Sequence, residues 1–149
     1  MKTITNGNKK SVVLLVAKNF LKYHPKSGDQ TKFEDKIRSG EKLHTIRSNF
    51  KEWEKKIRSI EEGNSKLLIK QWSGVPYRSP QVRLFEFEDG IGIQKLEVKD
   101  GKFIVDEKTE VSIEELADKD GLTVQEFKDW FQVFPTTPMA IIHFSNFRY

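Results

Sequence analysis

The sequence predicts one α+β domain over residues 1–149, built from five or six strands and about four short helices. Apolar runs rich in β-branched residues alternate irregularly along the chain with short segments that carry helix-capping signals. No repeat, low-complexity tract or linker divides the 149 residues. The absence of cysteine excludes disulfides, thiol nucleophiles and Cys-ligated metals.

The first third of the chain predicts a strand, a helix and an extended segment. Residues 12–16 form a continuous apolar run typical of a buried strand, and residues 22–29 are turn-rich. A capping box over residues 31–34 predicts that Thr31 accepts an amide hydrogen at the start of a helix over residues 33–39. The side chains of residues 42–47 alternate in character as those of an extended strand do. In a regular strand Lys42 and Thr45 would point to opposite faces, so they can share a site only if the chain bends between them.

The middle of the chain predicts a second helix and a recognition loop. Asn49 is a suitable cap for a helix that runs to about residue 62 and ends at Gly63. Residues 66–72 predict a strand, and one Gly and two Pro predict a loop over residues 73–80.

Two Asp-Gly pairs predict β-hairpins in the second half. Strands are expected over residues 82–88 and 91–98, joined by the two-residue turn Asp89-Gly90. Asp100-Gly101 predicts a second hairpin into a strand over residues 103–105.

The last third predicts two capped helices and a closing strand. Capping boxes over residues 112–115 and 123–126 begin helices that Asp120-Gly121 separates, and Pro135 ends the second helix. Residues 139–144 predict the final strand.

The net charge of +4 hides an uneven distribution. Residues 1–83 hold 19 Lys and Arg against 8 Asp and Glu, whereas residues 84–149 hold 7 against 14. If the fold keeps these halves apart, the basic half should attract polyanions; otherwise the lysines are a solvated surface. No apolar run approaches 18 residues and residues 1–10 are polar, so we expect a cytoplasmic protein without a membrane partner.

The sequence predicts neither a metal nor a cofactor. The three histidines, His24, His44 and His143, lack the i, i+4 spacing of a metal-binding helix. No Gly-rich phosphate loop, nucleophile elbow or dinucleotide fingerprint occurs. The chemistry therefore falls to Lys, Thr, Asp and Arg side chains.

One stretch resembles a known family. Residues 33–47 contain a short helix followed by Gly40-x-Lys42-x-x-Thr45-Ile46-Arg47, which resembles the ASCH domain family. Residues 113–123, followed by Phe127, Phe134 and Ile142-His143-Phe144, are similar to the family's closing helices and strand. Together these segments cover about half of the chain.

The resemblance implies a PUA-like fold, a small mixed β-barrel with flanking helices. It also implies that the domain binds RNA, a nucleobase or a modified nucleoside. The expected cleft is lined by Lys42, Thr45, Arg47 and Asp120. His44 is a further candidate for ligand contact, or a buried structural histidine.

Two alternatives remain open. The domain resembles small bacterial hydrolases that release the acyl group of N4-acetylcytidine, which implies Thr45 as nucleophile, Lys42 as base and Asp120 as acid/base, where those enzymes have glutamate. The helix over residues 49–63 and the loop over residues 72–80 have no counterpart in these enzymes. The other alternative is a protein-interaction module with a degenerate cleft.

The residues Trp72, Tyr77 and Arg78 form a second candidate site, for RNA. Aromatic rings beside a cation suit the stacking of an unpaired base while the cation meets phosphate. The structural alternative is that Trp72 ends a buried strand and Tyr77 packs over it.

Overall fold

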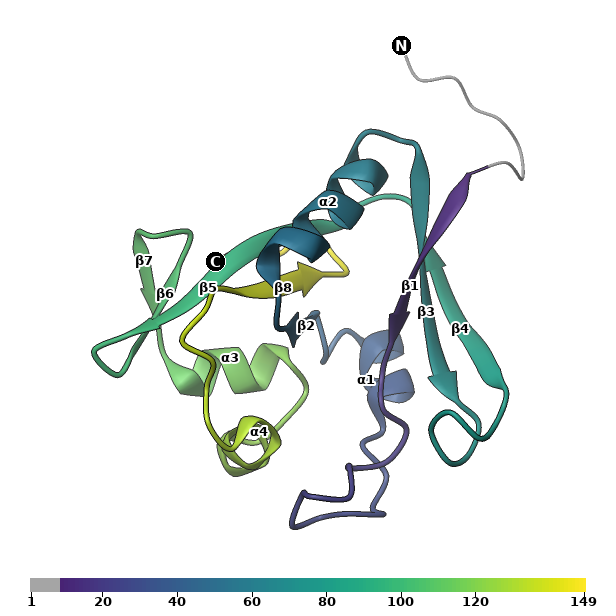
Figure 1. The fold of residues 1–149 in the computed structure, drawn as a ribbon, viewed down its shortest axis with the longest axis horizontal. Helices are drawn as coiled ribbons and strands as arrows, with labels where there is room; N and C mark the ends of the chain where they lie inside the picture. Colours follow the sequence, from purple (N-terminus) through teal and green to yellow (C-terminus); the bar gives the residue numbers. More distant parts are fainter. Residues whose placement is uncertain (1–8) are drawn as a thin grey trace.

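A computed structural model describes residues 9–149, which form eight strands and four helices in an α+β arrangement (Figure 1). The strands are β1 (Lys10–Leu15), β2 (His44–Arg47), β3 (Ser65–Trp72), β4 (Gln81–Phe87), β5 (Gly92–Lys99), β6 (Lys102–Val105), β7 (Thr109–Val111) and β8 (Met139–His143). The helices are α1 (Phe33–Ser39), α2 (Phe50–Glu61), α3 (Ile113–Lys119) and α4 (Val124–Phe131).

The strands form two sheets, so the described residues contain no single closed barrel, and the strand number exceeds the five or six expected. The smaller sheet has the order β1-β3-β4, with β1 parallel and β4 antiparallel to β3. The larger sheet has the order β2-β8-β5-β6-β7 and is antiparallel throughout. Helix α2 contacts strands of both sheets and buries Ile57 and Ile60 against them (Figure 1).

The expected hairpin at Asp89-Gly90 is wrong. Strand β4 pairs only with β3, and β5 pairs with β8 and β6, so Asp89-Gly90 carries the chain from one sheet to the other. The hairpin at Asp100-Gly101 is confirmed, because Lys99 pairs with Lys102 across it. Asp106 and Glu107 form a further hairpin turn, with φ of 51° and 64°, that no glycine marks in the sequence.

Helix capping agrees with the sequence at two of four predicted positions. Thr123 forms the complete capping box with Glu126, and Ser112 accepts a hydrogen bond from the Glu115 amide. At α1 the cap residue is Lys32 rather than Thr31, although Thr31 Oγ1 still accepts from the Phe33 amide at 3.3 Å. Asn49 occupies the α2 cap with φ of 67°, but its side chain makes no capping bond.

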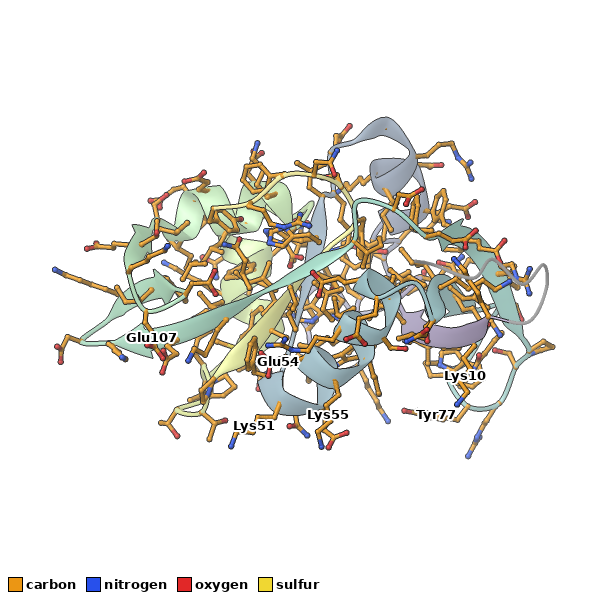
Figure 2. The ribbon with its side chains drawn as sticks, turned by 90° about the horizontal axis from the view of Figure 1, so that it is seen from above. Lys10, Lys51, Glu54, Lys55, Tyr77 and Glu107 are labelled. Atoms are coloured by element: carbon orange, nitrogen blue, oxygen red, sulfur yellow. The ribbon has the colours of Figure 1, made fainter. Side chains whose placement is uncertain are left out.

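The two differently charged halves of the sequence largely occupy different sides of the molecule (Figure 1). Strands β1 and β3 with α1 and α2 come from the basic half, and β5 to β8 with α3 and α4 come from the acidic half. Strand β4 spans the boundary between the halves, and β2 from the basic half joins the larger sheet. In Figure 2, Lys51, Lys55 and Tyr77 lie along one edge of the view, with Glu54 close to the two lysines, while Glu107 lies toward the opposite end. Helix α2 therefore carries acidic as well as basic side chains.

None of the helices within residues 9–149 combines the length and apolar character needed to cross a bilayer. Over the same residues, no three His, Asp or Glu side chains are grouped as metal ligands.

Candidate functional site

Lys42 and Asp120 form a buried ion pair at the centre of the site. The two residues pair as an isolated antiparallel bridge, and their exposed fractions are 1% and 5%. Lys42 Nζ donates to Asp120 Oδ1 at 3.0 Å and to the Asp120 carbonyl oxygen at 2.8 Å. The Phe33 ring centroid lies 4.1 Å from the same ammonium, which adds a cation–π contact.

A glycine makes this close approach possible. Gly121 has φ of +76°, and a Cβ there would lie 3.1 Å from Lys42 Cβ and 3.3 Å from Lys36 Cδ. The absence of a side chain lets the Lys42 stem pass beside the turn after Asp120. The Asp120-Gly121 dipeptide therefore forms the turn and also leaves space for the buried Lys42–Asp120 ion pair.

Burial and charge shift both pKa values of the pair. Burial lowers the pKa of Lys42, and the Asp120 charge opposes this only in part. Burial acts to raise the pKa of Asp120, but Lys42 and His44 outweigh it and hold that pKa below its ordinary value. The carboxylate is thus a hydrogen-bond acceptor at neutral pH.

Thr45 and Arg47 lie on the same face of β2 and contact each other. Arg47 Nη1 donates to Thr45 Oγ1 at 2.6 Å and to the Ile46 carbonyl at 3.0 Å, and Nη2 donates to the Leu15 carbonyl at 2.6 Å. Thr45 is buried and Arg47 is half-buried. Burial lowers the pKa of Arg47, and the charge of Asp120 acts in the opposite direction.

These four side chains meet around one narrow cavity. Its other lining residues are Ala17, Ile46 and the aromatic Phe33, Trp130 and Phe131. About 10 Å³ is open to the centre of a water-sized molecule, enough for about one water. Lys42 precedes β2, which begins at His44, and Lys42 and Thr45 both line the cavity.

The hydrogen bonds of the site divide the four residues into two pairs. Lys42 is bonded to Asp120, and Thr45 is bonded to Arg47. Among residues 9–149, no hydrogen bond joins Lys42 to Thr45. The arrangement presents donors, a hydroxyl and a carboxylate to one small space.

His44 lies behind Asp120 and is absent from the cavity lining. Its side chain is fully buried, with Nδ1 3.4 Å from Asp120 Oδ1 and Nε2 2.5 Å from the Tyr149 hydroxyl. Burial lowers the pKa of His44, against the opposing effect of Asp120. The structure therefore places His44 as a support for Asp120 rather than as a ligand contact.

The second group of candidate residues lies outside the cavity. Trp72 ends β3, and Tyr77 and Arg78 lie in the loop that joins β3 to β4. Tyr77 is 86% exposed with φ of 66°, its ring centroid lies 5.2 Å from that of Trp72, and Arg78 is exposed. These residues form a separate exposed feature.

The apolar residues of the lining, Phe33 among them, and Tyr149 behind the site were not assigned to it from the sequence. Helical spacing marks Trp130 and Phe131 as core residues, yet both line the cavity. Tyr149 contacts His44 from the far end of the chain, and no motif in the sequence marks it.

Comparisons with protein families, with curated proteins and with solved structures found no match for this chain. The resemblance to ASCH domains therefore rests on the sequence motif.

Proposed function

We propose that this chain is an ASCH domain of the PUA-like type that binds RNA, a nucleobase or a nucleoside through an unpaired base in the cavity. One observation carries the proposal: Lys42, Thr45, Arg47 and Asp120 surround the same opening as aromatic side chains. The motif residues of the resemblance are thus the polar residues of the cavity.

The chemistry of the lining suits a planar heterocycle. Lysine and arginine donate hydrogen bonds, a carboxylate accepts them, and a threonine hydroxyl does both. A base edge presents donors and acceptors side by side, and its faces stack on aromatic rings. Phe33 and Trp130, whose ring centroids lie 5.7 Å apart, supply apolar surface next to these polar groups.

A base is larger than the space now open, so binding requires the cavity to widen. Trp130 and Phe131 are the half-buried aromatic residues of the lining and lie at the end of α4, so a base would have to displace them from the aromatic rings they pack against. A base entering there would meet Arg47 and Thr45 along its edge. The expected signature is a change in Trp130 fluorescence on binding.

The test is a titration of the full chain with cytidine, uridine, adenosine and guanosine, followed by calorimetry and by fluorescence. Arg47→Lys removes the planar guanidinium and is expected to weaken binding about tenfold or more. The matched control Arg58→Lys changes an exposed arginine of α2 and should leave the affinity unchanged. If none of the four nucleosides binds at millimolar concentration, or Arg47→Lys binds as the native protein does, the proposal is wrong.

A second candidate function is the release of an acyl group from N4-acetylcytidine. It is favoured by the lowered pKa of Lys42, which makes the neutral amine more accessible, and by the Thr45 hydroxyl in the same cavity. In this reaction Lys42 first passes its ammonium proton to Asp120, and the neutral amine then accepts the Thr45 proton as the hydroxyl oxygen attacks the acyl carbon. Asp120 assists proton transfer to the departing amine, and water then hydrolyses the threonyl ester.

Acetate release from N4-acetylcytidine tests the second function directly. Conversion to cytidine should be abolished in Lys42→Ala and Thr45→Ala, with the fold of each variant checked by circular dichroism. Thr45→Val removes only the hydroxyl and is the sharper variant if Lys42→Ala fails to fold. No conversion by a folded native protein, or equal conversion by Thr45→Val, excludes this assignment for that substrate.

A further inference from the structure

The charges around the cavity do not balance. Lys42 is matched by Asp120, but Arg47 has no carboxylate oxygen within 4.0 Å among residues 9–149. Residues 1–8 contain no acidic side chain. Lys36 adds a further cation close by, with Nζ bonded to the Gly121 carbonyl at 2.7 Å and no carboxylate within the same limit.

The proximity of these cations is visible in their effect on Lys42. Both Arg47 and Lys36 contribute to the lowered pKa of Lys42, after burial, which is the larger cause. The cavity lining thus holds the two cations Lys42 and Arg47 against the single carboxylate of Asp120, which is bonded to Lys42. Lys36 lies outside this lining, where it acts on Glu126 as well. A half-buried cation without a countercharge is unfavourable unless an anion reaches it.

Among residues 9–149, three of the Arg47 hydrogen bonds are found, which leaves further donors on its guanidinium. A guanidinium carries five N–H groups. Three of its hydrogen bonds go to neutral acceptors, namely Thr45 Oγ1 and the carbonyls of Ile46 and Leu15. Guanidinium donors bind carboxylate and phosphate oxygens more strongly than neutral acceptors.

We propose that the cavity takes an oxyanion, the carboxylate or phosphate group of its ligand, with one charged oxygen against Arg47. The space for about one water equals the space for one such oxygen. The base then lies toward Trp130 and Phe131, and Arg47 contacts the base edge and the charged oxygen through different N–H groups. This inference rests on the proposed function for the choice of cavity and narrows the ligand to an anionic one, such as a nucleotide instead of a nucleoside.

Thermal unfolding in the presence of small anions tests whether the cavity binds an oxyanion, independently of any nucleobase. Sodium phosphate and sodium acetate are titrated at millimolar concentration, with sodium chloride added to hold the ionic strength constant. A saturable rise in Tm is expected for the native protein and for the control Arg58→Gln, because an anion bound to the folded state stabilises it. The rise should disappear in Arg47→Gln.

Arg47→Lys keeps the charge and should retain part of the rise, which guards against misfolding of Arg47→Gln. A Tm that rises equally in Arg47→Gln and the native protein, or shows no saturation, overturns the inference. Phosphate and acetate are compared with each other because their relative affinities separate a phosphate ligand from a carboxylate ligand.

A matched pair of larger ligands separates this inference from the proposed function. Cytidine 5′-monophosphate should bind about tenfold or more tightly than cytidine, and Arg47→Gln should remove the difference. Equal affinities leave the nucleoside-binding function standing and overturn the anion inference. An Arg47-dependent rise in Tm with phosphate or acetate, without binding of any of the four nucleosides or their 5′-monophosphates, supports the anion inference and overturns the proposed function.

Discussion

The Tyr149 hydroxyl lies 2.5 Å from His44 Nε2, so the two ends of the His44 ring face different partners, Tyr149 and Asp120. Burial raises the pKa of Tyr149 and lowers that of His44, so the phenol stays protonated and the imidazole stays neutral. The other ring nitrogen, Nδ1, lies 3.4 Å from the Asp120 carboxylate, which only accepts hydrogen bonds. Because a carboxylate facing Nδ1 favours a proton on that nitrogen, we expect His44 to be protonated on Nδ1 and to accept a hydrogen bond from Tyr149.

Histidine ¹⁵N chemical shifts measure this tautomer directly. We expect His44 to show a protonated Nδ1 and an unprotonated, hydrogen-bonded Nε2 at neutral pH. Tyr149→Phe should shift the Nε2 resonance, whereas Tyr23→Phe, which removes a hydroxyl bonded elsewhere, should not. A protonated Nε2 in the native protein contradicts the assignment.

His143 makes the protein sensitive to mild acid. Its side chain is fully buried, and burial, aided by the charges of His44 and Arg148, lowers its pKa from 6.5 to about 3. Between these values the unfolded chain binds a proton that the folded protein does not, so stability falls as the pH drops through this window and is unaffected by His143 above it. The two pKa values correspond to about 2 kcal/mol of lost unfolding free energy at pH 5.

Urea unfolding of the native protein and His143→Gln, each at pH 7 and pH 5, isolates this contribution. The glutamine amide can replace Nε2 as a donor to Gln94 Oε1 and does not titrate. The drop in unfolding free energy between the two pH values should be smaller in the variant by about 2 kcal/mol. Equal drops in both proteins would assign the acid sensitivity to other groups.

The polar residues of the cavity could be predicted from the sequence more readily than the fold that surrounds them. Lys42, Thr45 and Arg47 belong to one short motif, so local geometry nearly suffices to bring them together. Asp120 joins them across the bridge to Lys42, a long-range pairing that only the resemblance indicated. The resemblance therefore indicated a pairing between distant residues, which strand and helix patterns alone do not predict.

Sheet membership was not predictable because local patterns do not encode it. Asp89-Gly90 carries the turn signal of a hairpin, yet tertiary packing assigns the strands on its two sides to different sheets. Trp130 has the helical spacing of a core residue, and its half-buried ring lines a cavity because α4 ends there. These outcomes depend on contacts between distant segments.

The Lys42–Asp120 pair should show strong energetic coupling. Asp120→Asn removes the countercharge of a buried ammonium and is expected to destabilise the protein by about 3–5 kcal/mol. Adding Lys42→Met removes the stranded charge, so the double variant should be more stable than the sum of the single effects predicts. Urea unfolding of the four proteins completes the cycle.

The exposed pair Arg38–Glu34, with an N–O distance of 2.8 Å on α1, provides the matched control. An exposed i, i+4 pair is expected to couple by only about 0.3–0.5 kcal/mol. Similar coupling for the two pairs would show that Lys42 and Asp120 are not held as charged partners in the folded protein.

The β3–β4 loop gives a prediction for RNA that is independent of the cavity. Tyr77 is 86% exposed and Arg78 is exposed beside it, on the basic side of the molecule. If this loop contacts single-stranded RNA, Tyr77→Ala should weaken oligouridine binding by about 1–3 kcal/mol through lost stacking.

Arg78→Ala should weaken binding and reduce the slope of log affinity against log salt by about 1, because one phosphate contact is lost. Both variants should leave cytidine binding in the cavity unchanged, since neither residue lines it. Affinity for oligouridine that does not change with salt, or that survives both substitutions, would remove the loop from the binding surface.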